Sequence, residues 1–327
     1  FTALSCDNLS DNGAKLRRAV LDLAAARDPA GADWIAAHAA FPGTMVDRIV
    51  PAPDPAALAA AAARLGLLDR AALDTETFGQ WVIEDRFSSD RPDLAAVPGV
   101  VLTHAVAPWE QLKLRLLNGA HSAISYLGGL HDITFVHEVM SRPEGRALVE
   151  ALWNESAATL VPPPELDLPA YRAALLRRFG QPVPPHRTAQ IAIDGSRKLP
   201  QRLLAPIADR LDRNLPADAL CLAVAAWMRW QGGRTRGGTP FAVEDPVAPD
   251  TARILAAAAD DDDAVSGLLA LRSIFPGRLA ADPRFVSAVS RHYRDLAPGG
   301  APLASLVGRL QPAPRPSAPV PIAPTRS

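Results

Sequence analysis

WEQLKLRLLNGAHS, residues 109–122, decides the fold, because it is typical of one buried helix that also carries polar groups. At 100° per residue, Lys113, Asn118 and His121 fall within about 140° of one another on the helix surface. Leucines surround them, and a lysine in an apolar setting is either paired or has a shifted pKa. The alternative is a solvated helix edge with the lysine directed outward. Three polar groups on one arc favour a functional site.

These side chains suit proton transfer at a carbon–oxygen bond. A lysine titrates near pH 10.4 in water, about three units too high for a base at neutral pH, and burial lowers its pKa. Asn118 can donate a hydrogen bond to an alkoxide or carbonyl oxygen, and His121 can donate to a neighbouring hydroxyl. Glu110 lies one turn before Lys113, where it would relay protons to solvent or form a surface pair with the lysine.

Towards the N-terminus the pattern is that of an α/β sheet. FTALSC is expected to be a strand, CDNLSDNG a sharp turn, and residues 14–27 a helix. Further strand patterns follow at residues 41–50, 79–87 and 100–106. A strand followed by a polar turn and a helix puts Asn8 at a strand's carboxyl end, where ligands of α/β sheets bind. Its alternative role is that of a turn residue or helix cap.

From Gly119 onward the pattern is almost wholly helical, so the predicted fold class is mainly α. We expect residues 1–80 to be the remnant of an α/β domain and residues 81–311 to be mostly helical. The Pro-rich segment 312–327 is expected to be disordered, because it lacks the apolar residues that a core needs.

The composition limits the classes of function. The net charge of −1 over 327 residues argues against nucleic acid or an anionic membrane as the main partner. The two cysteines, Cys6 and Cys221, form no CxxC pair, which indicates a reducing compartment and no structural zinc. No apolar run reaches the length of a membrane span and no signal-peptide pattern is present. We therefore expect a soluble, cytoplasmic protein.

Four stretches carry a resemblance to a known family. KLRLLNGAHS resembles the active-site helix of the polyol-specific long-chain dehydrogenases, the family of mannitol 2-dehydrogenase and fructuronate reductase. SCDNLSDNG (5–13) is similar to the family's asparagine-bearing strand end, and FPGTMVDRIVP (41–51) to its V-D-R-I signature. IAIDGSRKLPQR (191–202) resembles a block of its C-terminal domain. The four matches occur in order across about the first two hundred residues.

The resemblance implies a helical C-terminal catalytic domain attached to part of a Rossmann-type domain, and NAD- or NADP-dependent hydride transfer at C2 of a linear sugar derivative. Lys113 would be the general acid–base, and Asn8 and Asn118 would bind the developing oxyanion. His121 would hold a substrate hydroxyl. Asp47 would orient His121 by accepting its hydrogen bond, although the Asp-Arg sequence here is also typical of a structural ion pair. No metal is required.

The resemblance also suggests where the substrate's distal end binds. Lys198 is the candidate cation, followed by Arg197 and Arg202. The sequence motif KLPQR is closer to that of the hexuronate-reducing branch of the family. The expected activity is therefore that of a fructuronate reductase acting on fructuronate and mannonate, with mannitol 2-dehydrogenase as the alternative.

The cofactor's phosphates have no expected site in this sequence. No G-x-G-x-x-G loop occurs in it, so the cofactor-binding residues are expected upstream of Phe1 and the chain is expected to be a fragment. The sequence does not distinguish NAD from NADP as the cofactor, and it does not indicate the oligomeric state. The alternative from another class is a truncated, catalytically inactive helical interaction module.

Overall fold

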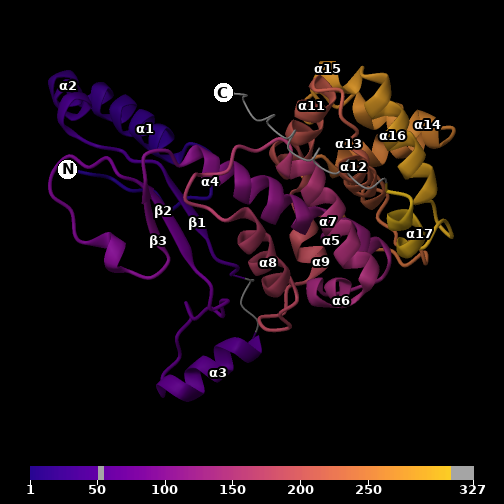
Figure 1. The fold of residues 1–327 in the computed structure, drawn as a ribbon, viewed down its shortest axis with the longest axis horizontal. Coiled ribbons are helices and arrows are strands. Elements are labelled where there is room, and N and C mark those ends of the chain that lie inside the picture. Colours follow the sequence, from indigo (N-terminus) through magenta and orange to yellow (C-terminus); the bar gives the residue numbers. More distant parts are fainter. Residues whose placement is uncertain (51–54, 311–327) are drawn as a thin grey trace, which may run out of the picture.

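The computed structural model describes residues 1–50 and 55–310 and shows a small sheet joined to a large helical part (Figure 1). The described chain is mainly helical, as predicted. The segment 312–327, predicted to be disordered, lies outside the described residues. Among the helices of the described ranges, none has the length and apolar character needed to span a membrane.

A three-stranded sheet lies in the N-terminal part, in the order β1 (Thr44–Asp47), β2 (Gln80–Glu84) and β3 (Val100–Thr103). β1 runs antiparallel to β2, and β2 runs parallel to β3. All three lie within predicted strand segments. The expected strand FTALSC is not a strand of the sheet and makes only an isolated parallel bridge, between Thr2 and Ala40.

The predicted boundary near residue 80 cuts this sheet. β2 and β3 follow residue 80 in the chain and still pair with β1 through the sheet. The sheet therefore extends beyond the predicted region 1–80, because parallel pairing brings a strand from later in the chain beside β2.

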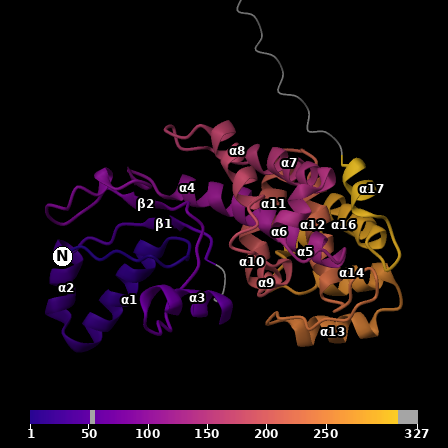
Figure 2. The same ribbon diagram turned by 90° about the horizontal axis from the view of Figure 1, so that it is seen from below.

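Three helices accompany the sheet. α1 (Asn12–Arg27) packs against α2 (Pro29–His38) at one end, and α3 (Pro55–Leu65) lies at the other (Figure 1). Figure 2 shows all three below the strands. None of the residues of the alanine-rich helix α3 is buried, as expected for a surface helix.

The helical part is reached through α4, which leads directly away from the sheet (Figure 1). The remaining helices and helical turns, in chain order, are η1 (Leu94–Ala96), α4 (Ala107–Leu112), η2 (Lys113–Asn118), α5 (Gly119–Leu130), α6 (Val136–Ser141), α7 (Pro143–Ala157), α8 (Leu168–Phe179), α9 (Thr188–Ala192), α10 (Gly195–Leu199), η3 (Pro200–Leu204), α11 (Ala205–Asp212), α12 (Asp218–Trp230), α13 (Ala248–Ala257), α14 (Asp261–Leu269), α15 (Gly277–Ala280), α16 (Pro283–Asp295) and α17 (Leu303–Gly308). η2 and η3 are π-helical turns.

The core of the helical part forms around α5 and α12. Nearly every residue of both helices is buried, and the two pack against each other. Gly129 permits this approach, because a Cβ built there would lie 2.5 Å from the ring of Trp230. α16 covers the other side of α12. The buried helix predicted from residues 109–122 therefore runs from the sheet into the centre of the molecule.

That helix contains a π-helical turn, which the prediction of a regular helix over 109–122 missed. A π turn closes with i→i+5 hydrogen bonds, so Lys113 and Asn118 are one π turn apart. The rotation of 100° per residue of a regular α-helix therefore does not hold between them. The indole N–H of Trp153 donates to the carbonyl of Leu116 inside the turn, at 2.8 Å. This bond satisfies a buried carbonyl where the regular helical pattern is interrupted.

A buried glutamate from α7 supports the start of α12. The two carboxylate oxygens of Glu155 accept hydrogen bonds from the backbone amides of Ala219 and Leu220, at 3.0 and 2.9 Å. Only 7% of the residue is exposed. Burial raises the pKa of Glu155 to about 7, although the two amides oppose this shift.

Glu155 makes stability depend on pH. Its pKa is about 7 in the folded chain against an ordinary 4.5, so its contribution is complete below pH 4.5 and is lost as pH rises through about 7. Glu155→Gln cannot titrate, so its free energy of unfolding should lack the fall that the wild type shows as pH rises from 5 to 8, a fall of roughly 3 kcal/mol at most. Urea unfolding at several pH values measures this difference.

The matched control is Glu150→Gln, which changes an exposed glutamate on the same helix and should follow the wild type at every pH. Equal pH slopes for Glu155→Gln and the wild type would contradict the prediction.

Candidate active site

Lys113 lies where the helical part meets the sheet, and its ammonium group bonds to two groups of the N-terminal part. Nζ donates to Oδ1 of Asn8 at 2.9 Å and to the backbone carbonyl of Val46. Only 7% of the lysine is exposed. Asn8 does not cap α1, because Asp11 occupies that position. The structure thus brings together a predicted base and a predicted amide that are 105 residues apart.

The surroundings of Lys113 lower its pKa. Burial is the largest cause, since it penalises the charged amine. The carboxylate of Asp47 opposes this, the cation of Arg202 adds to it, Glu110 opposes it and Arg178 adds to it. The balance favours the neutral amine at lower pH than for a lysine in water, which is the property that a general base needs.

The loop that carries Asn8 is held by Asn12, a residue that was not among the predicted site residues. Nδ2 of Asn12 donates to the carbonyls of Ser5, Asp7 and Thr44, and its Oδ1 accepts from the amide of Thr44 at 2.9 Å. Asn12 is 3% exposed. One buried amide therefore fixes the loop against β1. The only local signal for it was an asparagine in a polar turn, which is usually read as a turn residue.

Asn118 and His121 are both buried, and their polar atoms are available. Among the described residues the side chain of Asn118 has no hydrogen-bond partner, and Nε2 of His121 is buried without one. The His121 ring lies 4.6 Å from that of Phe179 and 5.3 Å from that of His186, centroid to centroid. Burial, reinforced by nearby positive charge, holds the pKa of His121 well below its ordinary value, so the ring is neutral.

Asp47 is bonded differently from the prediction. Its two oxygens accept hydrogen bonds from Arg178, at 2.9 Å each, and the predicted bond from His121 is not formed. A guanidinium group matches a carboxylate with two charge-assisted bonds, which a neutral imidazole cannot equal. Arg178 also binds Glu76, at 2.7 and 2.9 Å. Arg48, the alternative partner of Asp47, donates to a backbone carbonyl instead.

The three candidate substrate-binding cations have different environments. Arg202 donates to Oγ of Ser122 at 3.2 Å and forms no ion pair with a carboxylate of the described chain, and burial lowers its pKa to about 10. Lys198 donates to two backbone carbonyls at the end of α9, and burial lowers its pKa too. Arg197 is exposed on α10. Arg202 and Lys198 are thus the partly enclosed cations of the three.

Four of the predicted residues line two separate small pockets, and the other five line neither: Asp47, Asn118, Arg197, Lys198 and Arg202. The first, about 310 Å³, is lined among others by Asn8, Glu110, Lys113 and Gln201. The second, about 340 Å³, is lined among others by Glu76, His121, Arg178 and His186. In the described part no three His, Cys, Asp or Glu side chains gather as metal ligands, and the absence of a metal requirement stays a prediction.

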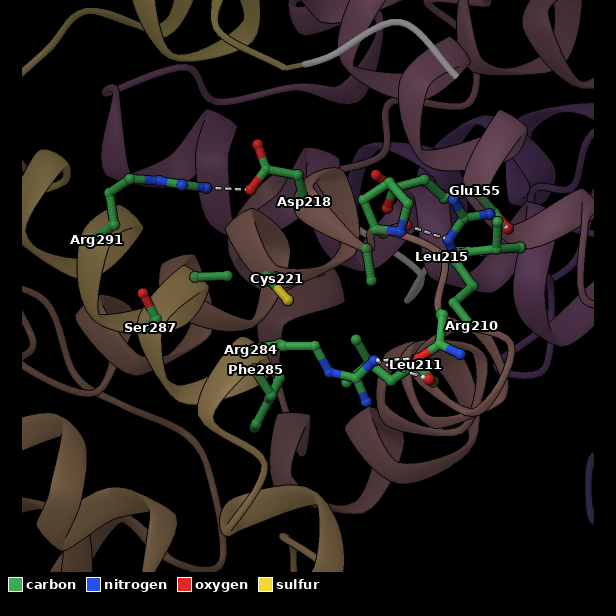
Figure 3. A pocket seen from close by; sticks show the side chains of 14 residues that line it. Glu155, Arg210, Leu211, Leu215, Asp218, Cys221, Arg284, Phe285, Ser287 and Arg291 are labelled. Atoms are coloured by element: carbon green, nitrogen blue, oxygen red, sulfur yellow. Dashed lines mark hydrogen bonds and ion pairs between the residues drawn. The ribbon is translucent and has the colours of Figure 1, made fainter. Parts of the chain in front are cut away.

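A larger pocket of about 1200 Å³ lies between the loop after α11 and helix α16, and none of the predicted site residues lines it (Figure 3). Its charged groups already have partners within the protein. Arg291 pairs with Asp218, and Arg284 donates to the carbonyl of Leu211 and to Oδ1 of Asn214. These contacts engage the side chains of Arg284 and Arg291, which line the pocket.

Two known domain families match consecutive parts of the chain. The mannitol dehydrogenase Rossmann domain matches residues 1–96, and the mannitol dehydrogenase C-terminal domain matches residues 105–297. The first match covers β1 and β2, β3 lies between the two matches, and the second match begins just before α4.

Individual relatives match almost the whole chain. D-mannonate oxidoreductase of Escherichia coli (strain K12) is 44% identical over 302 residues, which are 92% of this chain and 62% of the relative. The uncharacterized oxidoreductase YeiQ of the same strain is 41% identical over 301 residues, 92% of this chain and 61% of that protein.

A solved structure matches as well. The ternary complex of Pseudomonas fluorescens mannitol 2-dehydrogenase with NAD and D-mannitol superposes with a TM-score of 0.82 at 35% identity, over 95% of this chain and 62% of that one. The chain therefore spans about six tenths of the length of these relatives. Because both domain families match in order, and one of them covers more than half of the residues, the chain belongs to the mannitol dehydrogenase family.

Proposed function

We propose that this protein is an NAD(P)-dependent dehydrogenase that interconverts a keto-hexuronate and its C2 alcohol, as between fructuronate and mannonate. The observation that carries the proposal is the buried amine of Lys113, which has a lowered pKa and is bonded to Asn8. The 44% identity to D-mannonate oxidoreductase of Escherichia coli supports the substrate class.

Lys113 is the proposed general acid–base. In oxidation its neutral amine accepts the proton of the C2 hydroxyl, and in reduction its ammonium group returns it. Because Oδ1 of Asn8 accepts from Lys113, the amide N–H groups of Asn8 remain to donate to the substrate oxygen. Asn118 supplies a second donor, and both stabilise negative charge that develops on that oxygen. Hydride exchange is the chemistry that a bound nicotinamide supplies.

Two further residues are proposed to bind the substrate and to relay protons. His121, with its free Nε2, is proposed to hold a substrate hydroxyl. Glu110 lines the same pocket as Lys113 and would pass protons between that amine and solvent. The proposal places only the reacting end of a nicotinamide cofactor beside Lys113, since the given sequence contains no G-x-G-x-x-G loop for the cofactor's phosphates. NAD in the Pseudomonas fluorescens complex supports a dinucleotide of this kind.

Arg202 favours a substrate that carries a carboxylate. Its positive charge depresses the pKa values of Lys113, His121 and Lys198, so it acts on the whole site. Arg202 is a partly buried cation without an anionic partner in the described chain, which is unfavourable, and an anionic ligand would remove that cost. A neutral polyol would leave the charge uncompensated. Mannitol 2-dehydrogenase activity is the second candidate, favoured by the likeness to the D-mannitol complex.

Replacing Lys113 tests the reaction. In the protein expressed from the complete reading frame, Lys113→Met should lower kcat by about 10²- to 10⁴-fold, because the general acid–base is lost. NADH oxidation with D-fructuronate and with D-fructose, at neutral pH, measures this. Lys15→Met, an exposed lysine on α1, is the control and should match the wild type. Full activity in Lys113→Met would exclude the lysine mechanism.

Replacing Arg202 tests the substrate. Arg202→Met should lower kcat/KM for D-fructuronate on the order of 100-fold, because the proposed ion pair with the substrate carboxylate is lost. The value for D-fructose, which has no carboxylate, should change much less. Arg17→Met, which removes an exposed arginine of α1, should leave both values near the wild type. An equal loss on both ketoses would argue against carboxylate recognition by Arg202.

A further inference from the structure

Arg178 joins the helical part to the sheet through two carboxylates. It lies at the end of α8, and its Nη1 and Nη2 atoms each donate to one oxygen of Asp47 at 2.9 Å. Nε and Nη2 donate to Glu76 at 2.9 and 2.7 Å. The guanidinium carbon lies 4.1 Å from the centre of the Phe78 ring. The side chain of Arg178 is 8% exposed, so this is an enclosed group of charges rather than a surface ion pair.

The Asp47 carboxylate is a potential competitor for the amine of Lys113. Lys113 donates to the carbonyl of Val46, the residue immediately before Asp47 in β1. Apart from burial, Asp47 has the largest effect on the pKa of Lys113 and acts to raise it. An ammonium group drawn to a buried carboxylate would be held in its charged form. In the structure Asp47 is instead engaged on both oxygens by Arg178.

We infer that Arg178 is a positioning residue for the proposed reaction. It holds the carboxylate of Asp47 away from Lys113, so that the amine is bound by the neutral oxygens of Asn8 and Val46 and stays able to exchange a proton. The inference rests on the proposed function, in which Lys113 is the general acid–base. It gives Asp47 a role through Arg178 instead of through His121.

The charges around Lys113 give the direction of the effect. Asp47 on β1 and Glu110 on α4 raise its pKa, whereas Arg202 on η3 and Arg178 on α8 lower it. Removing Arg178 deletes one of the two cations and also frees Asp47 to approach the amine. Both changes raise the pKa of Lys113, and a protonated lysine cannot act as a base at neutral pH.

The chain offers a direct measurement, because its lysines are only Lys15, Lys113 and Lys198. Competitive acetylation with acetic anhydride between pH 6 and 11, read by peptide mass spectrometry, reports the neutral fraction of each amine. In Arg178→Gln the midpoint for Lys113 should move upward by about one pH unit or more, which makes its labelling about tenfold slower below the midpoint. Lys198 is the internal reference, since Arg178 is not among the charges that shift its pKa.

Further variants separate this role from a loss of structure. Glu76→Gln removes the other carboxylate bound by Arg178 and should not raise the midpoint for Lys113. Adding Asp47→Asn to Arg178→Gln should reverse the upward shift, because the competing carboxylate is gone. Arg178→Lys keeps a positive charge and should give a smaller shift, which provides a test if the glutamine variant does not fold.

An unchanged midpoint in a folded Arg178 variant, or a shift that survives in the double variant, would overturn the inference. Labelling needs no turnover, so the two proposals fail separately. A shifted Lys113 in a protein whose Lys113→Met variant keeps its activity would disprove the proposed function and leave the positioning of Asp47 intact.

Discussion

The burial of one ammonium group, that of Lys113, is the constraint on which the rest of the structure depends. An amine taken out of water needs acceptors, and here they are the amide oxygen of Asn8 and the carbonyl of Val46. Both belong to the N-terminal part, whereas the lysine belongs to the helix that enters the core of the helical part. The hydrogen bonds that form the site are therefore also contacts between the N-terminal part and the helical part.

Buried hydrogen bonds hold the elements that meet there. Asn12 satisfies the backbone of the loop that carries Asn8 and ties it to β1. Trp153 satisfies the carbonyl of Leu116 within the π-helical turn that follows Lys113. A π turn is a frequent feature of functional sites, because it changes the direction of the side chains around it. In this chain it sets Lys113 and Asn118 one wide turn apart.

The polar and charged groups at the site are of two kinds: some are paired with other groups of the protein, here called engaged, and others have no such partner, here called free. Arg178 is engaged with Asp47 and Glu76, which together make a closed set of ion pairs. Arg202 has no carboxylate partner in the described part of the chain, and His121 keeps a buried nitrogen without a partner. Engaged groups hold the geometry, and free groups are the ones that a ligand can satisfy. This division favours the two small pockets, one lined by Lys113 and the other by His121, over the larger pocket of Figure 3.

The sequence by itself determined the helical class, the three strand segments and the burial of Lys113, because these follow from local periodicity and residue type. The resemblance in short motifs then pointed to the family that both domain matches show. Only the tertiary structure decided which groups meet. Arg178 binds Asp47 across 131 residues, and no pattern in either stretch predicts that contact. Local sequence encodes the conformation of a segment, whereas the pairing of distant charges depends on how the segments pack.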